Sequence, residues 1–416
     1  MLPFFQYDSR DLFCEQVPVA EIAARAGTPC YVYSSRAILE NYRAYDQALA
    51  GAPHRICYAV KANSNLAILG LLARAGAGFD IVSGGELFRV LQAGGRADMV
   101  VFSGVGKTAD EVEYALAEGI HSFNCESEAE LALIDALAAR RSVVARAAVR
   151  VNPDVNAETH PYIATGLRDH KFGIDIGEAE EVYERARSLR NVAMEGVSCH
   201  IGSQILEAEP MLEALDKMLE FTARLRARGI AIESLDLGGG LGVPYRPGEQ
   251  APGIAGFAAA VGRKMEASKL CLMLEPGRSI VGDAGALLTR VLYRKCAGAK
   301  QFVIVDAGMN DLIRPALYQS HHEILPARLD EQRPEITADV VGPICESGDF
   351  LAHDRVMADA LPGDLLAVAT AGAYCFVAAS NYNSRVRAAE VLVEGDRWRI
   401  VRERETLQDL VRGETL

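Results

Sequence analysis

The sequence of 416 residues lacks several features that would place it in a specialised class of protein. Its nine cysteines include no C-x-x-C pair and show no zinc-ligand spacing, which favours reduced thiols over disulfides or a structural metal. Acidic residues outnumber lysine and arginine, 56 to 43, and the basic residues are scattered. The resulting net charge of −13 argues against a nucleic-acid or anionic-membrane partner.

Targeting, membrane and metal-binding patterns are also missing. The first ten residues contain neither the basic segment nor the apolar core of a signal peptide. The uncharged run from Leu365 to Ser380 is too short to span a bilayer and contains glycine, threonine and tyrosine. We therefore expect a cytoplasmic protein. No metal site is predicted, because the pair His321–His322, expected at the surface, has no third ligand at metal spacing.

From about residue 55 to 275, short apolar runs alternate with longer amphipathic stretches. Eight runs resemble strands: 56–60, 78–82, 99–102, 122–125, 144–151, 196–200, 234–237 and 271–274. Apolar residues recur at helical spacing over 65–74, 86–93, 126–139, 180–189, 211–228 and 254–267. This alternation predicts a (β/α)8 barrel of the TIM type, with a doubly wound open sheet as the alternative.

After residue 280 the helical periodicity fades and short strand-like runs follow one another. They cover 287–292, 301–305, 336–341, 365–369, 389–393 and 397–401. This pattern is typical of an all-β sandwich or barrel, which the strand-like segment Thr28–Tyr33 would complete. We therefore expect an α/β barrel over residues 36–278 and a β domain built from residues 1–35 and 279–416.

Lys61 follows the first apolar run and precedes a helical pattern. An amine at the end of a buried strand can have a lowered pKa and is a good former of Schiff bases. For an arbitrary lysine, a surface position is the commoner outcome. Here, however, unusual polar segments follow three later runs, at His200–Gln204, Gly238–Gly242 and Glu275–Arg278. Enzymes with this barrel carry their chemistry at these strand ends.

The segment Gly238–Gly242 would let backbone N–H groups approach an anion closely. It matches neither a Walker loop nor a dinucleotide fingerprint. An amine nucleophile and a phosphate cradle at one barrel mouth indicate pyridoxal phosphate. Glu275 is placed to keep the pyridine nitrogen protonated, and His200 to cover one ring face, although a core histidine is the alternative.

Two polar segments of the β region also carry candidate chemistry. Cys345 stands beside acids in Cys345-Glu-Ser-Gly-Asp349, and a thiol with an ordinary pKa of about 8.5 is a suitable general acid. Arg314 and Tyr318 lie four residues apart, so they can meet on one helix face and bind a carboxylate.

Several longer motifs resemble those of fold-type III pyridoxal-phosphate decarboxylases: Tyr58–Asn63, Gly78–Glu86, His200–Gln204, Glu275–Arg278 and Cys345–Asp349. Four more are similar to diaminopimelate decarboxylases: Arg150–Val155, Lys171–Ile174, Asp306–Tyr318 and Ser380–Arg385. The resemblance covers nearly the whole chain in order. Cys375 and Val386 depart from it, since glycine and proline are expected there.

The resemblance implies decarboxylation of meso-2,6-diaminopimelate to L-lysine and carbon dioxide by a homodimer with shared active sites. Lys61, Cys345 and His200 are then catalytic, with Cys345 and Glu346 supplied by the neighbouring subunit. The implied cofactor-binding residues are Lys61, His200, Ser203, Gly240, Glu275, Pro276, Gly277, Arg278 and Tyr374. The implied substrate-binding residues are Arg278, Arg314, Tyr318, Glu346 and Tyr374.

Charge offers an argument about the substrate that does not depend on motifs. The far end of diaminopimelate carries a carboxylate and an ammonium, which suit Arg278, Arg314 and Glu346. Ornithine or lysine carries only a cation there, which two arginines would repel. Decarboxylation of another basic amino acid or of a carboxy-polyamine, alanine racemisation and a non-catalytic pyridoxal-phosphate carrier remain the alternatives.

Overall fold

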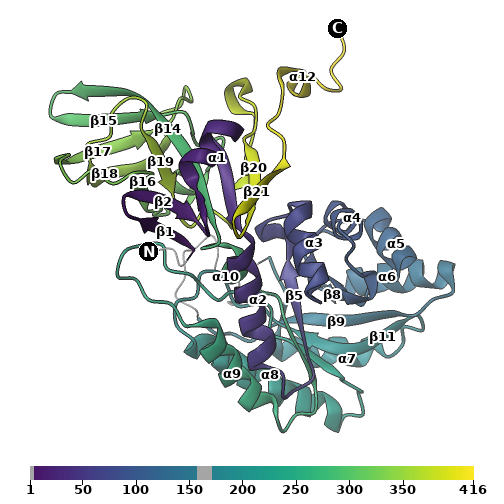
Figure 1. The fold of residues 1–416 in the computed structure, drawn as a ribbon. Coiled ribbons are helices and arrows are strands. Elements are labelled where there is room, and N and C mark those ends of the chain that lie inside the picture. The colour runs from purple at the N-terminus through teal and green to yellow at the C-terminus, as the bar shows by residue number, and fades with distance from the viewer. Residues whose placement is uncertain (1–3, 157–170) are drawn as a thin grey trace. The chain divides into compact units, whose positions relative to one another are not determined.

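The computed structural model describes residues 4–156 and 171–416, and the chain divides into two compact units (Figure 1). The first, here called the barrel unit, comprises Leu39–Val243 and Gln250–Ser279. The second, the β unit, comprises Met1–Ile38, Pro244–Glu249 and Ile280–Leu416. Within the described residues, no helix combines the length and the apolar character needed to cross a bilayer.

Eight parallel strands form the barrel: β5 (His54–Ala59), β6 (Gly78–Ile81), β7 (Val100–Phe102), β8 (Ser122–Cys125), β9 (Ala145–Asn152), β11 (Val192–Ser198), β12 (Ser234–Asp236) and β13 (Cys271–Leu274). Each pairs with the next, and β13 pairs with β5, so the sheet closes. The short strand β10 (Ile174–Asp175) adds to β9. Every predicted run overlaps one of the eight strands. The predicted closed barrel is therefore confirmed, and the open sheet is wrong.

Helices alternate with these strands and lie on the outside of the barrel (Figure 1). They are α3 (Leu66–Arg74), α4 (Gly84–Gln92), α5 (Ala109–Glu118), α6 (Glu128–Arg141), α7 (Ile176–Ala186), α8 (Glu209–Ala227) and α9 (Ile254–Met265). Side chains fix where some of them begin. The Ser83 hydroxyl accepts a hydrogen bond from the backbone of Glu86 at the start of α4, and Thr108 and Glu111 form a capping box on α5.

Four further elements join or follow the barrel strands. Helix α2 (Ser35–Ala48) precedes β5, and the 3-10 turn η1 (Val60–Ala62) follows it. A second 3-10 turn, η2 (Ala97–Met99), leads into β7, and the short helix α10 (Arg278–Val281) follows β13. Neither α2 nor α5 was predicted from the sequence pattern.

The β unit is built on one large sheet. Its strands are β4 (Cys30–Ser34), β14 (Gly285–Ala297), β15 (Lys300–Val305), β16 (Ile324–Pro326), β17 (Glu335–Val341), β18 (Phe350–Ala358), β19 (Leu365–Val368), β20 (Ala389–Glu394) and β21 (Arg397–Arg402). The main order is β18-β17-β15-β14-β4-β20-β21, and β19 pairs with both β14 and β16. Strand β4, predicted from Thr28–Tyr33, lies between β14 and β20.

Short elements complete the β unit. A small sheet of β1 (Phe5–Asp8), β2 (Asp11–Cys14) and β3 (Val17–Pro18) leads into helix α1 (Val19–Ala26). Helix α11 (Arg314–Tyr318) follows β15, and the turns η3 (Phe376–Ala378) and η4 (Tyr382–Ser384) precede β20. Helix α12 (Leu407–Leu410) lies near the C-terminus.

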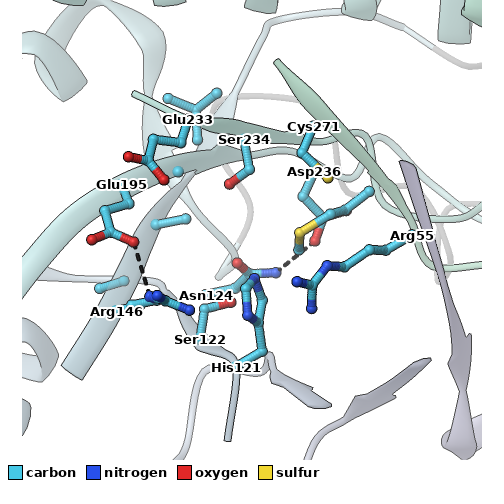
Figure 2. Close-up of a pocket in the computed structure, with 15 residues that line it drawn as sticks. Arg55, His121, Ser122, Asn124, Arg146, Glu195, Glu233, Ser234, Asp236 and Cys271 are labelled. Atoms are coloured by element: carbon cyan, nitrogen blue, oxygen red, sulfur yellow. Dashed lines mark hydrogen bonds and ion pairs between the residues drawn. The ribbon is translucent and has the colours of Figure 1, made fainter. Parts of the chain in front are cut away.

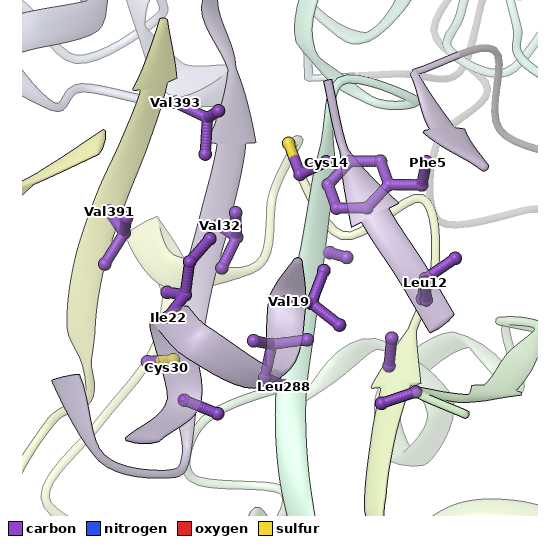
Figure 3. Packing of buried hydrophobic residues seen from close by; sticks show 14 of the residues in the cluster. Phe5, Leu12, Cys14, Val19, Ile22, Cys30, Val32, Leu288, Val391 and Val393 are labelled. Atoms are coloured by element: carbon purple, nitrogen blue, oxygen red, sulfur yellow. The ribbon is translucent and has the colours of Figure 1, made fainter. Parts of the chain in front are cut away.

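One apolar core joins helix α1 to the large sheet (Figure 3). Val19 and Ile22 of α1 pack in one cluster with Val32 of β4, Leu288 of β14 and Val391 of β20, and all five are fully buried. Burying a side chain of this size stabilises the fold by roughly 1.5–3 kcal/mol. The N-terminal segment is therefore an integral part of the β unit.

Candidate active site

Lys61 lies in the turn η1, directly after β5, at the C-terminal end of the barrel. Its Nζ forms an ion pair with Asp80 of β6, whose side chain is fully buried. The backbone of Gly277 approaches this turn so closely that a Cβ there would lie 2.8 Å from the Cβ of Ala62. The lysine amine is thus held at the barrel mouth by a buried carboxylate.

A buried hydrogen-bond network joins the ends of four strands. Asn124 donates through Nδ2 to Oδ2 of Asp236 (3.0 Å) and to Oε1 of Glu275 (3.1 Å). The Ser103 hydroxyl donates to the same Glu275 oxygen at 3.1 Å. Burial raises the pKa of Glu275 well above its ordinary value, and the nearby carboxylates of Asp236 and Asp80 raise it further. Glu275 therefore favours a protonated form, which can share its proton with a basic ring nitrogen.

His200 follows β11 and is largely buried. Its Nδ1 accepts a hydrogen bond from the backbone N–H of Gly239 at 3.2 Å. Burial lowers the pKa of His200 well below its ordinary value, and the cations of Arg150 and Lys61 lower it further. His200 is consequently a neutral flat ring, as a residue that stacks on an aromatic cofactor should be.

The glycine-rich loop after β12 packs backbone against backbone. Gly240 has a φ of +125°, and a Cβ there would lie 2.6 Å from the carbonyl oxygen of Gly202. The N–H of Ile205 donates to the Gly240 carbonyl at 2.9 Å. Any side chain at Gly240 would disrupt this contact, so the loops after β11 and β12 form one cradle built from backbone groups.

The segment after β13 connects this cradle to the lysine turn. Arg278 is 6% exposed, and its Nη2 donates to the hydroxyl of Ser203 at 3.0 Å. The carbonyl of Pro276 accepts a hydrogen bond from the N–H of Ala59 at 3.1 Å, at the end of β5. The predicted residues of the barrel unit therefore come together at one end of the barrel.

In the β unit, Arg314 and Tyr318 are the first and last residues of α11. The Arg314 guanidinium lies 6.0 Å from the centre of the Tyr318 ring, which confirms that these two side chains meet across one helical turn. Arg314 is 6% exposed. A buried guanidinium beside a phenol is well suited to bind a carboxylate.

The segment Cys345–Asp349 is held in place by its last residue. The buried Asp349 carboxylate accepts hydrogen bonds from the N–H groups of Ile344 and Met309, both at 2.6 Å. The Cys345 thiol is exposed. The neighbouring Glu346 carboxylate is also exposed and accepts a hydrogen bond from the Tyr382 hydroxyl at 3.3 Å. The thiol and the carboxylate are therefore available to a ligand or to a partner subunit.

Tyr374 adopts a left-handed backbone conformation, with a φ of +58°. This conformation is uncommon for a residue other than glycine and is frequent at ligand sites. The next residue, Cys375, has a φ of −107° and is buried. A cysteine thus fits the backbone at a position where the resemblance predicts glycine.

The barrel-unit residues fit pyridoxal phosphate. Lys61 would supply the amine for its aldehyde, the backbone around Gly240 would supply donors for its phosphate, and Glu275 would supply an acid for its ring nitrogen. Oδ1 of the buried Asp80 has no hydrogen-bond partner among the described residues, which leaves acceptor capacity beside the lysine. The carboxylates of Asp236 and Asp80, both near Glu275, favour a positively charged partner such as a protonated pyridine ring.

A cavity of about 250 Å³ lies at the opposite, N-terminal end of the barrel (Figure 2). Its wall includes Arg55, His121 and Arg146, and the Nε of Arg146 pairs with Glu195 at 3.1 Å. Burial lowers the pKa of His121 to about 4, and the two arginines lower it further. None of the predicted site residues lines this cavity, which is expected because barrel enzymes carry out their chemistry at the other end.

Sequence reasoning placed one histidine wrongly and left several polar residues without a role. His322 was expected at the surface, but it is fully buried and bonded to Arg314. Asp236 and Asn124 were not singled out, although Asp236 ends a strand directly before the glycine-rich loop. Asp80 lies within the motif Gly78–Glu86, and the structure pairs it with Lys61.

Known proteins resemble this chain over its whole length. The family described as pyridoxal-dependent decarboxylase, pyridoxal binding domain, matches residues 35–282. Diaminopimelate decarboxylase of Pseudomonas aeruginosa is 56% identical, with 99% of each chain covered, and that of Vibrio cholerae is 50% identical, with 98% of each covered.

Solved structures similar to this chain point to the same family. A structure of diaminopimelate decarboxylase from M. jannaschii is 37% identical and superimposes with a TM-score of 0.95, covering 100% of this chain and 98% of that one. One from Helicobacter pylori, complexed with L-lysine, is 42% identical with a TM-score of 0.91, covering 95% and 98%. The chain therefore belongs to the pyridoxal-dependent decarboxylases, and among them to the diaminopimelate decarboxylase family.

Proposed function

We propose that this chain converts meso-2,6-diaminopimelate to L-lysine and carbon dioxide with pyridoxal phosphate, the last step of lysine biosynthesis. The observation that carries the proposal is the ion pair of Lys61 with the buried Asp80, beside the Asn124–Asp236–Glu275 network, in a chain of this family. When bound, the cofactor acts as an electron sink for the bond that breaks at the substrate carbon.

The barrel-unit residues hold and orient the cofactor. Lys61 binds its aldehyde, while Ser203, Gly240 and the segment Glu275–Arg278 hold its phosphate region. Glu275 keeps a proton at the ring nitrogen, and the neutral ring of His200 covers one face. Tyr374 is proposed as a further contact to cofactor and substrate.

The distal end of the substrate is recognised by charge. Arg278, Arg314 and Tyr318 bind the distal carboxylate, and Glu346 binds the distal ammonium. Because Arg314 is buried and contacts no acid among the described residues, it favours a substrate that brings its own carboxylate. A simple basic amino acid has no such group at that end.

Cys345 is proposed to return a proton to the substrate carbon after carbon dioxide leaves. Its exposed thiol suits this role, because a thiol with an ordinary pKa is mostly protonated at neutral pH. We further propose a cytoplasmic homodimer in which Cys345 and Glu346 act in the site of the neighbouring subunit.

Product analysis tests this function. The purified, cofactor-loaded protein is incubated with meso-diaminopimelate and, in parallel, with L-ornithine, L-lysine and L-arginine. L-Lysine and carbon dioxide are expected from diaminopimelate alone. Turnover of a simple basic amino acid instead would contradict the roles of Arg278 and Arg314. No turnover of any substrate, with cofactor still bound through Lys61, would favour a carrier.

A further inference from the structure

Arg314 is a buried cation whose partners are all uncharged. Its Nε donates to Nε2 of His322 and its Nη2 to the hydroxyl of Ser320, both at 3.3 Å. The ring of Tyr245 lies 4.9 Å from the guanidinium carbon, and that of Tyr318 lies 6.0 Å away. Among the described residues, no carboxylate pairs with Arg314. Leaving a buried guanidinium without an anion is costly, so an anionic ligand completes this cluster.

The hydrogen bonds of His322 define its protonation state. An arginine Nε always donates, so Nε2 of His322 must accept. Nδ1 lies 2.9 Å from the carbonyl oxygen of Ala369, and it must donate because a carbonyl only accepts. His322 is therefore the neutral tautomer with its proton on Nδ1. The ring is fully buried, and the Tyr245 ring packs against it edge-on at 5.2 Å.

We propose that His322 is a positioning residue for substrate recognition, which fixes the Arg314 guanidinium without neutralising it. This inference rests on the proposed function. An aspartate or glutamate at the same place would hold Arg314 more tightly, but it would compete with the substrate carboxylate for the guanidinium. The neutral His322 ring accepts only from Nε of Arg314, and the Ser320 hydroxyl accepts one hydrogen bond from Nη2. Nη1, which donates to none of the described residues, is left for the substrate.

Two substitutions separate positioning from simple packing. In His322→Gln the side-chain amide reaches the place of Nε2 and still offers an acceptor to Arg314. In His322→Asn the amide reaches only the place of Nδ1, so it retains the bond to Ala369 and loses the one to Arg314. His321→Asn is the matched control, because His321 bonds to Glu323 and Arg355 and not to Arg314.

Steady-state decarboxylation of meso-diaminopimelate gives the readout, with thermal unfolding of each variant in parallel. His322→Asn should raise KM by about 10- to 100-fold with a smaller change in kcat, because a hydrogen bond to a charged group is lost far from the reacting bond. His322→Gln should recover most of that loss, and His321→Asn should match wild type. Equal losses in the Asn and Gln variants that follow their melting temperatures would overturn the proposal.

A double variant makes the test stricter. In an Arg314→Gln background, His322→Asn should have no further effect on KM, since the residue that it positions is gone. If the two substitutions multiplied each other's effects on KM, the proposal would be contradicted. If the wild-type protein released no lysine, the proposed function itself would be wrong. If His322→Asn kept the KM of wild type, only the role of His322 would be overturned.

Discussion

The two units hold buried charges of opposite sign. In the barrel unit three buried acids, Asp80, Asp236 and Glu275, lie near one another, and Asp80 pairs with the amine of Lys61. In the β unit the buried guanidinium of Arg314 has neutral partners, His322 and Ser320. Each arrangement is costly as it stands, and each is relieved by a ligand of the missing charge.

Under the proposed function, the two units recognise different groups. The barrel unit suits a cofactor with a protonated ring nitrogen, and the β unit suits a carboxylate. Meso-Diaminopimelate has a second amino-acid head to offer to Arg314, whereas ornithine and lysine have only a cation there.

Removing the amine should abolish the chemistry of the barrel unit. Lys61→Ala is expected to lower kcat by about 10⁴-fold or more, as loss of a covalent catalytic group does in other enzymes. The measurement is single-turnover release of carbon dioxide from meso-diaminopimelate. A variant that keeps even a tenth of the wild-type rate would show that another group holds the cofactor.

Removing the acid that faces the ring nitrogen should have the next largest effect. Glu275→Gln keeps the shape of the side chain but cannot keep the ring nitrogen protonated, so kcat should fall by about 10²- to 10³-fold. Glu233→Gln makes the same chemical change at the exposed N-terminal end of the barrel and should leave kcat unaltered. Similar kinetics in the two variants would contradict the role of Glu275.

Removing the cation of the β unit should alter specificity more than chemistry. Arg314→Gln should lower kcat/KM for diaminopimelate by about 10- to 100-fold, mainly through KM. The exposed Arg328 provides the control, and Arg328→Gln should behave as wild type. If Arg314→Gln left KM unchanged, the substrate carboxylate would have to bind elsewhere.

A buried acid of the β unit should make stability depend on pH. Burial raises the pKa of Asp311 to about 7, while its unfolded value is near 3.9. The folded state therefore binds the proton more tightly, and the stability that this gives is present below about pH 4 and is lost as the pH rises to 7.

The substitution Asp311→Asn removes this titration. Urea unfolding at pH 5 and at pH 8 should show that wild type loses roughly 1–3 kcal/mol more than Asp311→Asn over that interval. Parallel stability curves for the two proteins would mean that the carboxyl titrates normally.

The sequence predicts the barrel well, because apolar runs and helical spacing alternate regularly in it. Strand β18 was not predicted, because His353, Asp354 and Arg355 interrupt its apolar pattern. Its pairing with β17 is also irregular. Helix α5 buries only Val112 and Ala115, which leaves a faint helical pattern despite its capping box.

The positions of the candidate site residues could be predicted from the sequence, but their connections only in part. Lys61, His200, Glu275 and Arg278 lie where the sequence places them, because each follows a strand. The pairing of Lys61 with Asp80 depends on side-chain directions on neighbouring strands, which a linear pattern does not contain. His322 lies outside regular structure, and its burial against Tyr245 depends on a segment that is distant in sequence.

The most direct test is a crystal structure of the cofactor-loaded protein with L-lysine, the product that retains the distal amino-acid head. We expect the lysine carboxylate within hydrogen-bond distance of Arg314, with His322 Nε2 still accepting from the Arg314 Nε. A lysine carboxylate bound away from Arg314, with that guanidinium contacting only His322, Ser320 and the tyrosine rings, would contradict the account.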